Sequence, residues 1–352
     1  MLFNMESESV WTFLKNVGEP VVMYGTGNGG DKVFEAFEKL NISVSGVCAS
    51  DGFVRNRFFH GFKVMPISYF EEKYTNFTVA VVFGSSVPGV MENIKALSQK
   101  HTVVVPCVPV VGNEIFDESC KEKHTDEINR AYSLLADEKS KEVFSSYINF
   151  QFSGKLKYLF SCETPENEAF INCIHLGDKE NYVDIGAYKG DTVEKFLKYT
   201  NGKYGSIIAA EPDVKTFNKL VNNCGQLKNF KAVNMPVTNE DKEVLFSSDA
   251  GRQSKIGKGE LRKAVSLQSL CGDILPSYIK ADAEGEELMI LEGGALLLKK
   301  CTPKMNIAAY HKNEDIFKIP ILLNEISESY KIYLRHHPYI PAWDTNYYCE
   351  QE

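Results

Sequence analysis

The 352 residues lack the sequence features of membrane-spanning, secreted and nucleic-acid-binding proteins. No apolar run reaches the roughly 20 residues that a bilayer-spanning helix needs. The opening stretch, MLFNMESESVWTFLKN, has acids where a secretory signal has positive charge, so we expect a cytoplasmic protein without a membrane span. No run of Lys or Arg is longer than a pair and the formal net charge is −8, which argues against a nucleic-acid partner.

Cysteine motifs are also missing. The nine cysteines form no CxxC pair and no Cys/His spacing typical of a metal site. An odd, unpatterned set in a chain that is not exported indicates reduced thiols that are buried as small apolar residues. We therefore expect no structural zinc.

The sequence instead alternates strand and helix patterns, and it does so twice. Apolar runs such as VVMYG and FTVAVVFGSS alternate with amphipathic segments near the N-terminus, and the rhythm returns from NYVDIG onward. A stretch with helical periodicity lies between them. We expect an α/β protein with two Rossmann-like domains and parallel sheets: an N-terminal domain at 1–112, a helical linker at 113–166 and a C-terminal domain at 167–352.

The stretch NYVDIGAYKGDT at 181–192 ends a strand in a glycine turn. Such glycines let the backbone pass close to a ligand, and Glu211 ends the next strand, where an acid can accept both hydroxyls of a ribose. The turn lacks GxGxxG spacing, because Gly186 is followed only by Gly190 and a bulky residue lies between them. Asp184 would repel a pyrophosphate but would favour the cationic sulfonium of S-adenosylmethionine. The turn therefore predicts a methyl-donor site.

Three motifs in this order, VDIGAYKGDT, AAEPD and YIKADAEGEELMILEGG, resemble the FkbM-type methyltransferases, whose pattern is VDxGAxxGDT, an EP pair and KxDxEGxExxxLxG. The resemblance covers about 164–352. It implies a class I methyltransferase fold for the C-terminal domain and S-adenosylmethionine as the methyl donor. It also implies methyl transfer to a sugar hydroxyl of a surface glycan, or of its nucleotide-linked precursor, in polysaccharide biosynthesis.

The same resemblance implies roles for individual residues. The methionine and ribose side of the donor pocket would be formed by Asp184, Gly186, Ala187, Tyr188, Gly190, Asp191 and Thr192. Glu211 would take the ribose diol, and Pro212 and Asp213 would shape the adenine edge. Asp282 and Glu284 would lie at the carboxyl end of a central strand and face donor and acceptor.

A sugar hydroxyl is a weak acid, so its methylation needs a base or a metal near the donor. Asp282 and Glu284, two positions apart in ADAEG, can act as base or hold a divalent ion that polarises the hydroxyl. We interpret Glu286 and Glu287 as acids that suit the N-terminal dipole of the following helix. His311 is the best single candidate for a neutral-pH base, and a structural hydrogen-bonding role is its alternative.

A second glycine turn, VVMYGTGNGG, does match GxGxxG, at Gly25, Gly27 and Gly30, and Asp51 follows in the position of a ribose acid. This segment resembles the small Rossmann-like modules found beside sugar-modifying enzymes, which implies a nucleotide or nucleotide-sugar ligand. Three alternatives stay open. They are an NAD-dependent sugar-modifying enzyme, a non-catalytic binding protein, and a structural module that forms a homodimer.

Overall fold

The computed structural model describes residues 1–247, 255–257 and 259–351. The chain forms two compact units. The N-terminal unit consists of Met1–Asn129, Lys141–Thr164 and His336–Asp344, and the C-terminal unit consists of Arg130–Ser140, Pro165–Arg335 and Thr345–Glu352. Each unit contains one large sheet with mostly parallel pairings, so the expectation of an α/β fold with parallel-stranded sheets is confirmed.

The sheet of the N-terminal unit has the order β3-β4-β2-β1-β5-β6. Its strands are β1 (Val21–Tyr24), β2 (Gly46–Ala49), β3 (Phe58–Phe59), β4 (Phe62–Pro66), β5 (Thr78–Val81) and β6 (Thr102–Val104). All described pairings are parallel except β3 with β4. The helices that follow the strand ends are α2 (Asn28–Leu40), α3 (Ile67–Lys73) and α4 (Pro88–Ser98), and α1 (Val10–Asn16) precedes β1. The GxGxxG turn therefore connects the central strand to α2.

The helices of the expected linker do not form a third unit. They are α5 (Glu118–Lys123), α6 (Thr125–Ser133), α7 (Glu138–Ser153) and α8 (Lys157–Cys162), and they divide between the two units. The segment His336–Asp344, which the sequence assigned to the C-terminal domain, belongs to the N-terminal unit. There Ile340 pairs with Ser85 through two backbone hydrogen bonds of 2.7 and 3.0 Å. Such pairing between distant segments leaves no local sequence signal, which is why contiguous boundaries were expected.

The sheet of the C-terminal unit has the order β16-β17-β15-β14-β7-β8-β9. Its strands are β7 (Asn181–Ile185), β8 (Ser206–Ala210), β9 (Phe230–Val233), β14 (Tyr278–Ala281), β15 (Lys304–Ala308), β16 (Tyr330–His336) and β17 (Thr345–Gln351). β17 runs antiparallel to β15, whereas β14 and β8 run parallel to β7 on either side. The strand order reverses at β7, and this reversal creates a crevice at the carboxyl ends of the strands.

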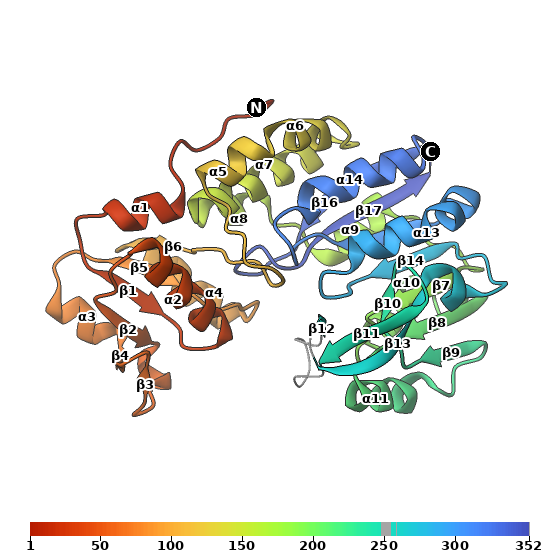
Figure 1. Cartoon of the computed structure of the whole chain (residues 1–352), viewed down its shortest axis with the longest axis horizontal. Coiled ribbons are helices and arrows are strands. Elements are labelled where there is room, and N and C mark those ends of the chain that lie inside the picture. The colour runs from red at the N-terminus through yellow and green to blue at the C-terminus, as the bar shows by residue number, and fades with distance from the viewer. Residues whose placement is uncertain (248–254, 258, 352) are drawn as a thin grey trace. The chain divides into compact units, whose positions relative to one another are not determined.

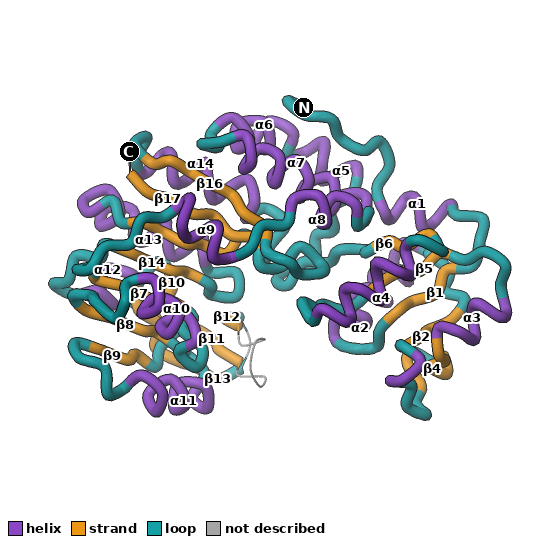
Figure 2. The backbone as a smooth tube through the Cα atoms, turned by 180° about the vertical axis from the view of Figure 1, so that it is seen from behind, coloured by secondary structure: helices purple, strands orange, loops and turns teal. Residues whose placement is uncertain are grey.

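Helices cover both faces of this second sheet. They are α9 (Glu166–Cys173), α10 (Asp191–Tyr199), α11 (Val214–Cys224), α12 (Leu267–Cys271), α13 (Glu287–Cys301) and α14 (Asp315–Ile326). α13 and α14 lie in front of the strands in Figure 1, and α9 and α10 lie in front of them in Figure 2. Residues such as Phe196 of α10 and Tyr182 of β7 pack together in the core. Because helices cover both faces of the sheet, a site can form at the edge where the strands end.

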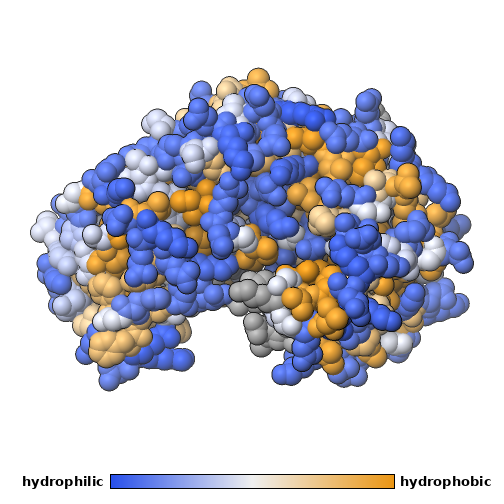
Figure 3. Space-filling view, in the orientation of Figure 1, coloured by the Kyte–Doolittle hydropathy of each residue, from blue (hydrophilic) through white to orange (hydrophobic). Residues whose placement is uncertain are grey.

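A smaller ribbon interrupts the chain between β9 and β14. It contains β10 (Val237–Thr238), β11 (Lys242–Ser247), β12 (Lys255–Ile256) and β13 (Glu260–Ser266). Leu245 and Leu261 face each other across β11 and β13 and are exposed, and Figure 3 shows apolar side chains gathered over these strands. Among the described residues, no helix has the length and apolar character needed to cross a membrane.

Candidate active site

The candidate site lies where β7, β8 and β14 end. The pairing of Ile185 with both Ala210 and Ala281 brings the three strand ends into register. The glycine turn follows β7, Glu211 follows β8, and the ADAEG segment follows β14. The structure therefore brings the expected donor-site residues and the expected catalytic carboxylates to one edge of the sheet.

Two glycines determine the shape of the turn after β7. Gly186 has φ +74°, and a Cβ there would lie 1.9 Å from the backbone oxygen of Asp282. Gly190 has φ +93° and precedes the first residue of α10. The amides of Gly186 and Ala187 both donate to the Ala210 carbonyl at 3.0 Å. The turn is thus held against both neighbouring strand ends, with no room for side chains at its glycines.

A buried ion pair lies under this turn. Asp184 is fully buried, and one of its oxygens accepts a hydrogen bond from the Thr192 hydroxyl. Lys280, on the neighbouring strand β14, has its Nζ 3.5 Å from the other oxygen and donates to the Gly186 carbonyl at 2.8 Å. Burial opposes the charge of Lys280, but the facing Asp184 carboxylate raises the lysine pKa. The pair supports the turn from below.

Glu211 is positioned by backbone amides. Its two carboxylate oxygens accept from Tyr188 N at 2.9 Å and from Asp213 N at 2.8 Å. Burial raises the pKa of Glu211 to about 7, although these two amide bonds act in the opposite direction. Asp213 caps α11 by accepting from Thr216 N at 2.8 Å. The carboxylate keeps lone pairs for two further donors.

The Pro212 carbonyl lies beside Glu211 and is held by two side chains. It accepts from Asn234 Nδ2 at 3.1 Å and from the Arg262 guanidinium. Arg262 comes from β13, so the ribbon is tied to the end of β8. The expected adenine edge, Pro212 and Asp213, is therefore part of a rigid turn.

Four carboxylates surround His311 on the other side of the site. The imidazole Nδ1 lies 3.0 Å from Glu287 Oε1, and Nε2 lies 3.4 Å from Asp282 Oδ1 and 3.7 Å from Glu284 Oε2. Asp315, the fourth, is buried, and its Oδ2 accepts from Lys312 N at 2.9 Å. Glu284 has a left-handed backbone, with φ +51°, an uncommon conformation that is found where surrounding structure enforces it.

The charges of this cluster follow from its burial. Burial opposes the charged imidazolium, but Glu287, Asp282 and Glu284 together raise the pKa of His311 to about 10. Burial raises the pKa of Glu284 to about 7, and burial and the nearby Glu287 raise that of Asp315 to about 7. His311 is thus an imidazolium at neutral pH. Asp282 is the most accessible of the four carboxylates, with 38% of its side chain exposed.

The structure adds Lys280, Glu287 and Asp315 to the residues expected from the sequence. Glu287 is in the first turn of α13, as expected of a dipole-pairing acid, but its side chain is fully buried against His311. It also accepts from Ala283 N at 2.6 Å, which fixes the loop that carries Asp282. The interpretation of Glu287 as a helix-end acid was therefore incomplete. The sequence does contain a signal for Lys280, because a lysine inside an otherwise apolar strand is unusual.

The N-terminal residues singled out in the sequence lie around the β1–α2 turn. Gly25 has φ +124°, Gly27 precedes the first residue of α2, and Gly30 is buried within that helix. Asp51 is exposed in a short 3-10 helix after β2, and its Oδ1 accepts from Ser68 N at 3.3 Å. The strand–turn–helix context expected for GxGxxG is thus present.

Comparisons with known proteins give one family match and one solved structure of similar fold. Residues 184–339 match the family model of the methyltransferase FkbM domain. The crystal structure of methyltransferase FkbM from Methylobacillus flagellatus KT has a similar fold, with TM-score 0.75 and 18% identity, over 95% of this chain and 91% of that chain. Aeropyrum pernix fibrillarin with natively bound S-adenosyl-L-methionine has TM-score 0.32 and 12% identity over 53% of this chain and 74% of that chain. No curated protein sequence matches the chain. The segment 184–339 is therefore similar to a methyltransferase FkbM domain.

Proposed function

We propose that the C-terminal unit transfers a methyl group from S-adenosylmethionine to a sugar hydroxyl. The observation that carries the proposal is the meeting, at one sheet edge, of the glycine turn, Glu211 and the Asp282–His311 cluster. A donor site alone would serve any methyltransferase. A carboxylate beside it, held by a buried imidazolium, suits an acceptor that must lose a proton.

The residues of the turn support this proposal, because their chemistry suits the groups of S-adenosylmethionine. Glu211 offers lone pairs for a ribose diol, and the glycines leave the backbone bare for a close approach. Asp191 Oδ1 is buried without a hydrogen-bond partner, so the turn contains an acceptor that an ammonium group would satisfy. When bound, S-adenosylmethionine supplies an electrophilic methyl group on a sulfonium.

In this proposal Asp282 takes the proton of the acceptor hydroxyl as the new oxygen–carbon bond forms. Its Oδ1 also lies 3.3 Å from the Tyr310 hydroxyl, which donates to it and limits its rotation. His311 acts as a positioning residue, because its charge holds the loop of Asp282 and Glu284 close to α13. Glu287 in turn orients the His311 ring. Since the cluster contains its own cation, we propose that no divalent ion is needed at Asp282 and Glu284.

The acceptor class rests on the FkbM resemblance. A sugar hydroxyl is a weak acid that stays protonated at neutral pH, so a positioned base is of most use for such an acceptor. The acceptor would be part of a glycan or its nucleotide-linked precursor.

A second binding role is proposed for the N-terminal unit. Its β1 lies between β2 and β5, at the switch point where Rossmann-like sheets bind nucleotides. A nucleotide or nucleotide-sugar at Gly25, Gly27, Gly30 and Asp51 stays a prediction.

The donor assignment predicts a pH-dependent affinity. Because the Glu211 pKa is raised to about 7, the acceptor form of this carboxylate is lost as the pH falls below 7. Affinity for S-adenosylhomocysteine should then fall by about tenfold per pH unit. Glu211→Gln should weaken binding by ~10-fold or more at pH 8, since a charged acceptor is worth about 1.5–3 kcal/mol, and should flatten the pH dependence. Calorimetry between pH 5.5 and 8.5 measures both.

The matched control is Glu194→Gln, which makes the same change at an exposed position of α10. It should keep both the affinity and the pH dependence of the unchanged protein. Equal affinity in a folded Glu211→Gln variant would remove Glu211 from the donor site and, with it, the proposed pocket.

A further inference from the structure

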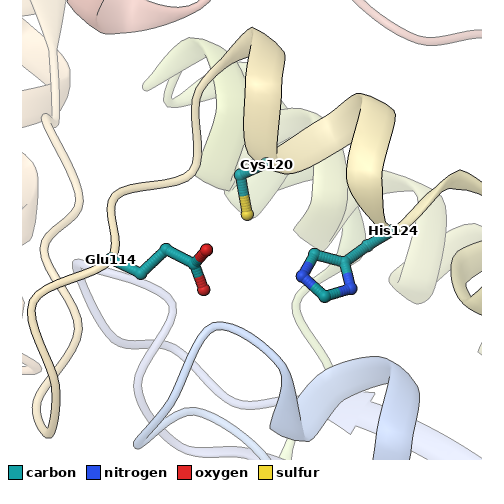
Figure 4. Close-up of side chains that lie close together, drawn as sticks. All are labelled: Glu114, Cys120 and His124. Atoms are coloured by element: carbon teal, nitrogen blue, oxygen red, sulfur yellow. The ribbon is translucent and has the colours of Figure 1, made fainter.

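A cluster in the N-terminal unit has no role in methyl transfer. Cys120 and His124 lie one helical turn apart, and the His124 amide donates to the Cys120 carbonyl at 3.1 Å, so both side chains are on one face. Both are buried, with 3% and 6% of their surface exposed. Glu114 approaches from the loop between β6 and α5. Figure 4 shows the three side chains pointing toward one another, and their ligand atoms all lie within 4.8 Å of one another.

The chemistry of these three groups is that of a zinc site. A thiolate, an imidazole and a carboxylate are the ligand types that zinc binds in tetrahedral sites. With the imidazole neutral, the thiolate and carboxylate supply two negative charges to match the dication. The set combines one ligand from α5, one from the residue that ends this helix and one from a loop.

His124 also has the orienting contact that zinc-binding histidines show. Its Nδ1 lies 2.5 Å from Glu127 Oε2, three residues further along the chain. In metal sites such a carboxylate fixes the tautomer and directs the other ring nitrogen to the ion. Here it would direct Nε2 into the cluster.

Against the expectation of no structural zinc, we propose that Glu114, Cys120 and His124 bind a zinc ion, with water in the fourth position. The ion ties the loop after β6 to α5 and so fixes the exit from the N-terminal sheet. Glu114 also pairs with Lys123 at 2.9 Å, with both side chains more than half exposed. An exposed ion pair of this kind is worth at most about 1 kcal/mol, so the zinc ion can displace Lys123.

The test is a Co²⁺ titration of the full chain after dialysis against chelator, followed by Zn²⁺ competition. We expect one ion per chain and a thiolate-to-cobalt charge-transfer band in the near ultraviolet, which Zn²⁺ removes. Cys120→Ser should abolish the band. Glu127→Gln should keep the band but weaken Co²⁺ binding by about 10–100-fold, because it loses only the orienting contact.

Two controls separate ligation from folding. Cys107→Ser changes another buried cysteine of the same unit, and Glu122→Gln changes an exposed acid of α5, and both should bind Co²⁺ like the unchanged chain. Glu114→Gln, at an exposed position, should weaken binding without unfolding. The proposal is overturned if the chain shows no thiolate band, or if Glu114→Gln and Glu127→Gln both bind Co²⁺ as the unchanged chain does. S-adenosylhomocysteine affinity, a property of the other unit, is not expected to change in any of these variants.

Discussion

Replacing Asp282 by Asn should slow methyl transfer by ~10²–10⁴-fold, the usual contribution of one positioned base. Affinity for S-adenosylhomocysteine should stay nearly the same, because Asp282 Oδ1 contacts Tyr310 and His311 and its Oδ2 lies 3.9 Å from Lys280, which keeps its closer partner Asp184. The amide keeps the size of the carboxylate and loses its charge and its basicity. Rates of S-adenosylhomocysteine formation, measured with an acceptor drawn from a panel of nucleotide-sugars and glycans, give the first quantity, and calorimetry gives the second.

The control for this change is Asp273→Asn, the same replacement at an exposed site of the C-terminal unit. His311→Ala should also lose most of the turnover, since Asp282 and Glu284 lose the charge that holds them. EDTA should leave the rate of the unchanged enzyme as it is. Full activity in Asp282→Asn would remove the base from the mechanism. Loss of activity in EDTA that Mg²⁺ or Mn²⁺ restores would assign the carboxylates to a metal instead.

Gly186→Ala should destabilise the C-terminal unit by about 4 kcal/mol or more and abolish donor binding. The new Cβ would lie 1.9 Å from the Asp282 carbonyl oxygen, so the ends of β7 and β14 would have to separate. The left-handed φ of +74° adds its own strain. Urea unfolding gives the loss of stability, and calorimetry with S-adenosylhomocysteine gives the loss of binding.

Gly202→Ala separates these two causes. Gly202 has φ +72°, close to that of Gly186, but a Cβ there meets nothing within 4 Å. It should therefore lose only about 1–2 kcal/mol from the left-handed backbone and keep donor binding. If both alanine variants unfold at the same urea concentration, the close approach of the turn to Asp282 is not the reason that position 186 requires glycine.

The meeting of the proposed donor-side residues at one sheet edge was predictable because its signals are local. The glycines of the turn and the acid of AAEPD each follow directly from a strand pattern, and parallel strands end at the same edge. The expected residues Gly186, Gly190 and Glu211 accordingly lie around one strand end.

The remaining parts depend on contacts between distant segments. The role of Lys280 depends on the strand register that places it beside Asp184. The role of Glu287 depends on its contact with His311, which lies further along the chain. A helix-end acid on the surface and one buried on an imidazole have the same sequence pattern. The same limit explains why Ile340 was assigned to the second domain although it pairs with Ser85 in the first.

The most direct measurement is a calorimetric titration of the whole chain with S-adenosylhomocysteine and, separately, with NAD, repeated on Gly27→Val. A Cβ at Gly27 would meet no protein atom within 4 Å, so we expect this variant to keep its fold and to block only a ligand of the N-terminal turn. We predict one S-adenosylhomocysteine site per chain with the same affinity in both proteins. Absence of S-adenosylhomocysteine binding, or its loss in Gly27→Val, would contradict a donor site at Glu211 and the glycine turn of the C-terminal unit.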